Sequence, residues 1–205
     1  MSRSRPGPGT ARSRGCAVVC LGCLLVTGCA TARRTGAGQP PAVPTAGWLD
    51  RTYLVTCDGI VPQGFSASVV GGHARVPADG SRPPHYDHYD VAVTGTASGD
   101  VDGDGASDAV VLLECSPQPS NGILQEVQVF SSTGDTLGTL PSPRTLQAQA
   151  PLPPEYDAAG LSVRDGEIVA AMTAYAPDDV HASGPSLPVV VRWRFDGREF
   201  VRVSF

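Results

Sequence analysis

The chain has 205 residues, a formal net charge of −5 and only 6% aromatic residues, together with 24 Gly and 19 Pro. This length limits it to one or two small domains, and the composition excludes a coiled coil and a collagen-like fibre. The acidic balance argues against binding to nucleic acid. All 15 basic residues are Arg, and the chain contains no Lys.

The first 28 residues predict a signal peptide. Four Arg and no acidic residue precede an apolar run from Cys16 to Val26, and Thr27 and Gly28 then lead directly to Cys29. The run is too short to span a hydrocarbon core of about 30 Å as a helix. The Val-Thr-Gly-Cys string resembles the bacterial lipobox, which implies cleavage before Cys29, diacylation of its sulfur and a place on the extracytoplasmic face of the cell membrane. Plain secretion and a retained anchor helix are the alternatives.

Residues 29–47 predict the lipidated cysteine and a flexible linker. The stretch from Ala30 to Gly47 has no hydrophobic periodicity and is rich in Pro and Gly, which is typical of a tether. As a random coil it would reach on the order of 20 to 25 Å. Two acyl chains hold a protein on a bilayer. We therefore expect the membrane to be a partner through the lipid at Cys29, without a spanning segment.

Two cysteines, Cys57 and Cys115, remain after the signal peptide is removed and Cys29 is modified. An even pair outside the reducing cytoplasm predicts a disulfide. In the chain-entropy model, closing a loop of this length stabilises a domain by roughly 4 kcal/mol. Two buried free thiols are the alternative.

Residues 48–205 predict a single all-β domain, either an antiparallel sandwich or a curled sheet of about ten short strands joined by hairpins. All the aromatic residues lie in this region, and its apolar residues follow a period of two. In chain order, alternating runs are separated at Gly71–Gly72, Thr133–Gly134, Asp165–Gly166 and Asp196–Gly197. Each of these pairs predicts a hairpin turn. For the two Asp-Gly pairs we expect type I′ turns, which need positive φ at both positions.

Residues 100–108 have the spacing of a calcium-binding loop. Acidic residues stand at loop positions one, three, five and nine, with Gly103 and Gly105 at positions four and six. Ca²⁺ takes six to eight oxygen ligands, and the carbonyl group of Ala106 would supply position seven. Position twelve is Val111, so the Glu of an EF-hand is missing. The following Ala109–Leu113 indicates a buried strand and not a helix.

The loop resembles the calcium-binding turns of FG-GAP and integrin-type propeller repeats, over the 25 residues from Val91 to Cys115. The resemblance implies a structural Ca²⁺ at a turn between antiparallel strands, and we expect it to lie next to the disulfide. The implied ligands are Asp100, Asp102, Asp104, Ala106 and Asp108. We expect a dissociation constant of about 10⁻⁴ to 10⁻³ M. Because only one copy occurs and no Phe-Gly precedes it, a whole propeller is not implied. A metal-free acidic hairpin turn is the alternative.

The wider segment around this loop resembles a group of uncharacterised secreted or lipid-anchored proteins of GC-rich Gram-positive bacteria. The similar strings are Tyr86-Asp87-His88-Tyr89, the Asp-rich loop, Gln125 to Val129 and the ending Trp193 to Gly197. This resemblance implies a location in the cell and no activity.

Residues 85–90 form the densest local cluster of side chains that bind metals or transfer protons. In a strand, however, His85 and His88 would point to opposite faces, and we expect one of these faces to be solvated. Ser183 lies two residues from His181, but the G-x-S-x-G string of a hydrolase is missing. No catalytic motif is found.

We therefore expect a non-catalytic, lipid-anchored binding or scaffold domain of the cell envelope, stabilised by Ca²⁺. Its ligand would be an envelope protein or a glycan, and not a nucleic acid. Two alternatives stay open. One is a lipid-anchored hydrolase that uses His85, His88 or His181 with Asp87, and the other is an inhibitor or regulatory partner of another envelope protein. From residue 48 onward, 9 basic residues stand against 20 acidic ones, a net charge of −11.

Overall fold

The computed structural model describes residues 45–80, 84–150 and 152–203. The predicted signal peptide, the lipidation site at Cys29 and nearly all of the linker lie outside these residues. The described part is all-β, as predicted, with eleven strands in three antiparallel sheets. It also contains two 3₁₀ helices, η1 (Thr45–Trp48) and η2 (Pro143–Leu146). Within this part, no helix has the length and apolar character needed to cross a membrane.

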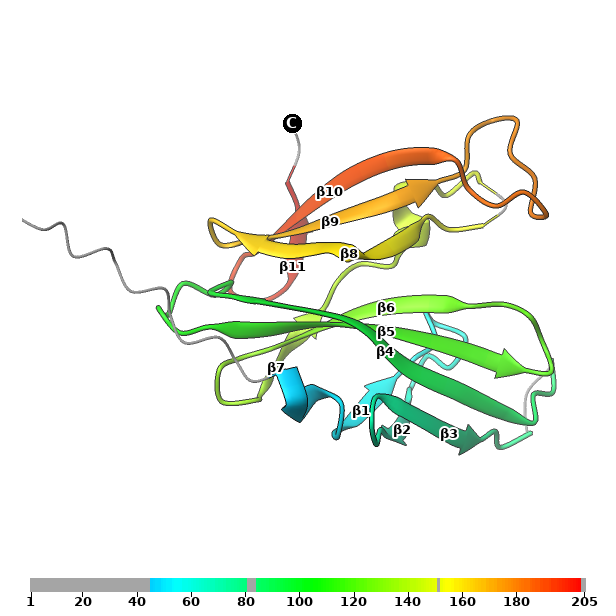
Figure 1. Cartoon of the computed structure of the whole chain (residues 1–205), viewed down its shortest axis with the longest axis horizontal. Coiled ribbons are helices and arrows are strands. Elements are labelled where there is room, and N and C mark those ends of the chain that lie inside the picture. Colours follow the sequence, from blue (N-terminus) through cyan, green and yellow to red (C-terminus); the bar gives the residue numbers. More distant parts are fainter. Residues whose placement is uncertain (1–44, 81–83, 151, 204–205) are drawn as a thin grey trace, which may run out of the picture. The chain divides into compact units, whose positions relative to one another are not determined.

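The central layer is a five-stranded sheet with the strand order β3-β4-β5-β6-β7 (Figure 1). Its strands are β3 (His73–Pro77), β4 (His88–Gly99), β5 (Asp108–Gln118), β6 (Leu124–Phe130) and β7 (Thr136–Thr139). The run Ala109–Leu113 in β5 is fully buried, which confirms the predicted buried strand. The run is continuously apolar because side chains alternate between the two faces of a sheet and both faces of this strand are covered.

One face of the central sheet packs against a four-stranded sheet with the order β11-β10-β9-β8. Its strands are β8 (Glu155–Arg164), β9 (Glu167–Ala174), β10 (Leu187–Phe195) and β11 (Phe200–Arg202). The core between the two sheets joins Val110 and Leu112 of β5 to Ile168, Met172 and Trp193. These side chains come from alternate positions of their strands, as a two-layer sandwich requires.

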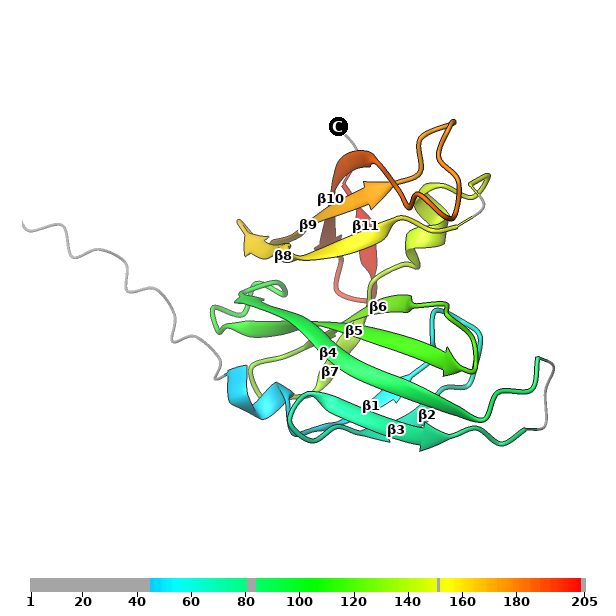
Figure 2. The same ribbon diagram turned by 45° about the vertical axis from the view of Figure 1, so that its right-hand side comes forward.

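The other face of the central sheet packs against a two-stranded sheet (Figure 1, Figure 2). Its strands are β1 (Thr52–Val55) and β2 (Phe65–Ser68). This second core joins Val111 and Leu113 of β5 to Tyr53. Trp48, the last residue of η1, stacks on Phe130 of β6 with the ring centroids 4.9 Å apart. The start of the described chain is therefore fixed directly to the central sheet.

The hairpin predicted at Gly71–Gly72 is only partly right. The turn is present, with φ angles of 58° and 84° at the two glycines. The strands that it connects, β2 and β3, nevertheless belong to different sheets. The reason lies in the hydrogen bonds of Gly72, whose N–H donates to the carbonyl of Leu49 and whose carbonyl accepts from the N–H of Val93. These bonds direct the chain from the two-stranded sheet to the edge of the central one.

The other three predicted turns connect paired strands of one sheet, β6 with β7, β8 with β9 and β10 with β11. Asp165 and Gly166 both have positive φ, 53° and 76°, as a type I′ turn requires.

The type I′ prediction is wrong for Asp196–Gly197. Only Gly197 of this pair has a positive φ, 95°, and the loop extends to Glu199. The carboxylate of Asp196 accepts hydrogen bonds from the N–H groups of Arg198 and Glu199, both at 2.9 Å. Such side-chain to backbone bonds favour a wider turn.

The two larger sheets approach closely where β4 passes β8. A Cβ atom at Gly99 would lie 2.7 Å from the side chain of Val163, and one at Gly95 would lie 3.2 Å from that of Ala158. Only glycine allows these backbones to come so near. The register of β8 on β9 is irregular between Tyr156 and Leu161, in the same region.

Candidate functional site

The Asp-rich loop joins β4 to β5 at one end of the central sheet (Figure 1). One carboxylate oxygen from each of Asp100, Asp102 and Asp108 lies within 4.8 Å of the others. Among the described residues this is the single group of three or more His, Cys, Asp or Glu side chains that converges in this way. Asp104 lies outside the group, and Ala106 is half-buried in the same loop. Three converging carboxylates fit the oxygen preference of Ca²⁺.

Backbone amides hold the loop in shape. The carboxylate of Asp100 accepts hydrogen bonds from the N–H groups of Gly103 and Gly105, at 2.7 and 3.0 Å. Asp102 and Asp104 each accept one from the N–H two residues later, at 3.1 and 2.7 Å. Both glycines have positive φ, 83° and 86°, which explains why glycine stands at these two positions. An ionised carboxylate has about four lone-pair sites, so these bonds leave room for a cation.

Asp108 differs from the other loop carboxylates because it is completely buried. One of its oxygens accepts from the N–H of Val101 at 2.9 Å, and the other accepts from the N–H of Ser132 at 3.1 Å. Burial raises the pKa of this carboxyl group, the Val101 hydrogen bond lowers it, and the charges of Asp102 and Asp104 raise it further. A cation in the loop would offset both the burial and the repulsion.

The Ser132 bond links the loop to the turn between β6 and β7, and this turn also contacts the start of the domain. Arg51 donates a hydrogen bond of 2.6 Å to the carbonyl of Gly134. Its guanidinium lies over the rings of Trp48 and Phe130, 4.8 and 4.3 Å from their centroids. The Asp-rich loop, the β6–β7 turn and the point where the linker joins the domain thus lie together.

Cys57 and Cys115 lie at disulfide distance, with their Cα atoms 5.3 Å apart, and both are buried. The predicted pairing is confirmed. The expectation that the disulfide lies next to the Asp-rich loop is wrong. Asp108 begins β5, and Cys115 stands seven residues further along it, or about 23 Å at the rise of an extended strand.

Glu126 in β6 is a buried carboxylate that the sequence analysis did not single out. It is 5% exposed and accepts hydrogen bonds from the hydroxyl of Thr56 at 2.6 Å and the amide of Gln128 at 2.8 Å. The N–H groups of Thr56 and Asp58 also donate to it, at 3.1 and 3.4 Å. Glu126 therefore holds the segment around Cys57 against the central sheet. In the sequence, the feature that points to Glu126 is a charged residue inside a run of strand-forming residues.

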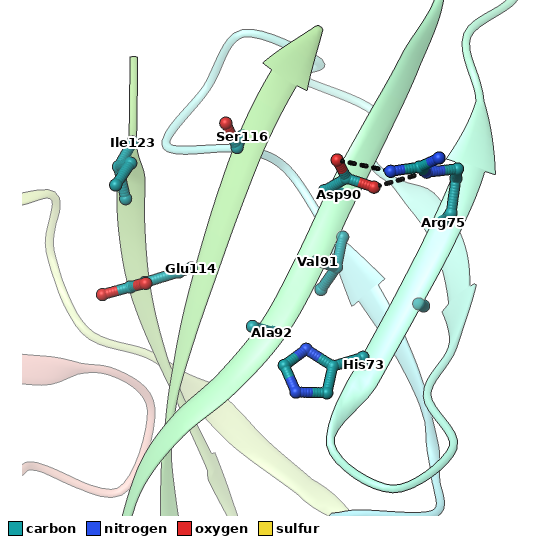
Figure 3. A pocket seen from close by; sticks show the side chains of 9 residues that line it. His73, Arg75, Asp90, Val91, Ala92, Glu114, Ser116 and Ile123 are labelled. Atoms are coloured by element: carbon teal, nitrogen blue, oxygen red, sulfur yellow. Dashed lines mark hydrogen bonds and ion pairs between the residues drawn. The ribbon is translucent and has the colours of Figure 1, made fainter. Parts of the chain in front are cut away.

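A hollow of about 480 Å³ lies on the part of the central sheet furthest from the Asp-rich loop. Figure 3 shows Arg75 of β3 and Asp90 of β4 facing each other across the strands, with His73 beside the small Ala92 and Glu114 extending from β5. The guanidinium of Arg75 donates to both oxygens of Asp90, at 2.7 and 3.1 Å. Its hydrogen bonds lower the pKa of that carboxyl group. The hollow is thus open and combines charged side chains of both signs with small apolar ones.

The histidines of residues 85–90 are placed in different surroundings. His88 lies in β4 with its Nε2 atom 3.5 Å from a carboxylate oxygen of Asp90, whereas His85 contacts the carbonyl of Gly80 through Nδ1 at 2.7 Å. In the region of Ser183, the hydroxyl donates to the carbonyl of Val180 at 2.9 Å, as in an ordinary turn. Among the described residues, no group of three or more His, Cys, Asp or Glu side chains converges at residues 85–90 or at His181.

What these residues do has to be inferred from their own geometry and chemistry, because no protein-family model, curated protein or solved structure matches this chain.

Proposed function

We propose that this chain is a non-catalytic binding or scaffold domain of the cell envelope, held on the extracytoplasmic face by a lipid at Cys29 and stabilised by a structural Ca²⁺. The observation that carries this proposal is the gathering of three loop carboxylates within 4.8 Å. Such a grouping is repulsive without a counter-charge, and a divalent cation supplies one.

The location of the loop supports a link between the ion and the anchor. Thr45 begins the described residues, 16 positions after Cys29. A flexible linker of that length spans about 20 to 25 Å, so the end of the domain near η1 is the one closest to the bilayer. The Asp-rich loop is at this end. The hollow lined by His73 and Glu114 is towards the opposite end of β4 and β5.

Thermal melting of the full-length protein in detergent, with millimolar Ca²⁺ against EGTA, tests the ion. At a Ca²⁺ concentration ten times the dissociation constant, we expect about 1.4 kcal/mol of stabilisation, or a rise in Tm of about 3 to 5 °C. Asp102→Asn should abolish the rise, whereas Asp165→Asn, in a turn outside the loop, should leave it unchanged. An equal Tm in Ca²⁺ and EGTA would contradict the proposal.

Labelling of cells with radioactive palmitate tests the anchor. The full-length chain should incorporate label and sediment with the membrane fraction, and Cys29→Ser should lose both properties because its side chain cannot form the thioether. A Cys29→Ser protein that still sediments with membranes would indicate a retained helix. A wild-type chain without label would indicate plain secretion.

A further inference from the structure

Two neighbouring hollows lie beside the Cys57–Cys115 pair, apart from the Asp-rich loop. The inner one, of about 190 Å³, is bounded by the chain after β1, by β6, by the start of η2 and by the start of β8. The outer one, of about 220 Å³, is bounded by the β5–β6 connection and the residues before β8. They share Asp58, Gln125 and Pro143. We call the two together the Asp58 recess.

Tyr156 of β8 lines the inner part of the Asp58 recess and carries an unsatisfied polar group. Its side chain is 6% exposed, and its hydroxyl group is buried without a hydrogen-bond partner among the described residues. Burial, with a further contribution from the charge of Asp58, raises the pKa of this hydroxyl. Buried hydroxyl groups are nearly always paired. An unpaired one at the wall of a recess indicates that a ligand group can complete the site.

Asp58 supplies a carboxylate at the same place. The residue is half-buried and has a φ of 50°, in the left-handed region that Asp and Asn enter more readily than most residues other than Gly. Its N–H donates to the carboxylate of Glu126, which fixes the backbone at this position. The Asp58 carboxylate itself has a hydrogen bond with the side chain of Ser142. Burial raises the pKa of Asp58, and its hydrogen bond from Ser142 and the charge of Arg144 lower it. A cation in the recess would favour the ionised form.

The lining of the recess is acidic and partly aliphatic. Asp58, Glu126, Glu114 and Glu155 contribute carboxylates, whereas His181 is the one basic side chain among the lining residues and Arg144 acts on Asp58 through its charge. Ile123, which is 62% exposed, and several prolines add an apolar wall. A ligand that matches both features has a positive charge on an aliphatic chain.

We propose that the Asp58 recess binds an aliphatic primary amine. The ammonium group would donate hydrogen bonds to the carboxylate of Asp58 and to the hydroxyl oxygen of Tyr156, and the methylene chain would pack along Ile123 and the neighbouring prolines. An ammonium has three N–H donors, and its bond to a carboxylate is charge-assisted and strong. This inference rests on the binding role proposed above and gives it a ligand class.

The amine must come from another molecule. The chain contains no Lys, so neither its own side chains nor those of a second copy can supply an alkylammonium group. A free diamine and a lysine side chain of a partner protein present the same chemistry. The two sources differ in the groups next to the amine, and this difference can be measured.

Isothermal titration calorimetry of the full-length protein in detergent, with 1,5-diaminopentane as the probe and EGTA present, tests the proposal. We expect saturable binding of the diamine and none of 1-pentanol, which has the same chain length without charge. Asp58→Asn should weaken binding by about tenfold or more, and Tyr156→Phe by about three- to tenfold. The matched control is Asp157→Asn, an exposed carboxylate on β8, which should change the affinity less than about twofold.

Two results would overturn the proposal. One is no binding of the diamine by a wild-type protein that melts cooperatively, and the other is equal binding by wild type and the two recess variants. Melting curves of every variant show that it is folded, and Tyr156→Phe removes no described hydrogen bond of the hydroxyl. Tighter binding of Nα-acetyl-lysine amide than of the diamine would assign the recess to a partner's lysine, and the reverse order to a free diamine. Because EGTA is present and the titration does not depend on the lipid, failure here leaves the calcium and anchor tests intact.

Discussion

The two groups of acidic side chains in this domain are built in opposite ways. In the Asp-rich loop, Asp100, Asp102 and Asp104 accept from N–H groups two to five residues later, and residues 102–105 are exposed. In the group around Glu126 the partners are distant, since Thr56 and Glu126 are 70 residues apart, and the carboxylate is buried. Apart from the bond between Ser132 and Asp108, the loop is shaped by its own segment, whereas the Glu126 group exists only when β1 and β6 are already packed.

Because of this difference, we expect the two groups to contribute unequally to the free energy of unfolding. Exposed loop carboxylates in local turns contribute little to global stability, since water competes for their bonds. A buried carboxylate that joins distant segments contributes much more, because its removal leaves several buried donors unpaired. The four changes below test this ranking, from the largest expected loss of stability to a small gain.

Replacing both Cys57 and Cys115 by Ala should produce the largest loss. Without the cross-link, the segment that carries Thr56 and Asp58 loses its covalent attachment to β5, and the free energy of unfolding should fall by about 4 kcal/mol. Urea denaturation of the wild type and the double variant measures the difference. Treatment of the wild type with a reductant during unfolding should reproduce it, and a loss below about 1 kcal/mol would mean that the cross-link does not stabilise the domain.

Glu126→Ala should cost about 3 kcal/mol, because it leaves donors of Thr56 and Gln128 buried without an acceptor. Glu126→Gln keeps the shape and one acceptor oxygen, so its loss should be roughly half as large. Urea denaturation again gives the values. If both variants lose less than about 0.5 kcal/mol of unfolding free energy, the group around Glu126 stabilises the domain no more than the Asp-rich loop does.

Within the loop, Asp108→Ala should cost about 2 kcal/mol in EGTA, since this buried residue joins the loop to the β6–β7 turn through Ser132. Asp104→Ala, at an exposed position with one local bond, should cost less than about 0.5 kcal/mol. Equal losses would show that the distinction between local and long-range bonds does not hold inside the loop.

Tyr156→Phe should stabilise the protein slightly in the absence of any amine, by up to about 1 kcal/mol, because it removes a buried hydroxyl that has no partner. Differential scanning calorimetry detects the expected rise in Tm of a few degrees. A clear destabilisation would mean that the hydroxyl group already has a favourable interaction in the folded protein.

The parts of the fold that depend on neighbouring residues could be predicted from the sequence. The buried run of β5, the turn at Asp165–Gly166 and the convergence of Asp100, Asp102 and Asp108 follow from alternation, from the φ preference of Gly and from the spacing of Asp, although Asp104, an implied ligand, lies outside the cluster. The pairing of the last two cysteines follows from their number.

The parts that depend on distant segments could not be predicted. Nothing near Gly71–Gly72 indicates that Leu49 and Val93 take its hydrogen bonds and separate β2 from β3. The Asp58 recess brings together residues from β6, η2 and β8, and its key feature, the unpaired hydroxyl of Tyr156, is a property of packing and not of any local motif. The loop at Asp196 was mispredicted for a smaller reason, because the side chain competes with the turn geometry that Asp-Gly usually favours.

The stacking of Trp48 on Phe130 has a mechanical consequence. A domain held by its N-terminal side receives any pull from the cell surface at η1, and Trp48 and Arg51 pass this tension to β6 and to the β6–β7 turn. A tether at this side would therefore load the central sheet through these contacts before it loads β1, which follows Arg51 in the chain.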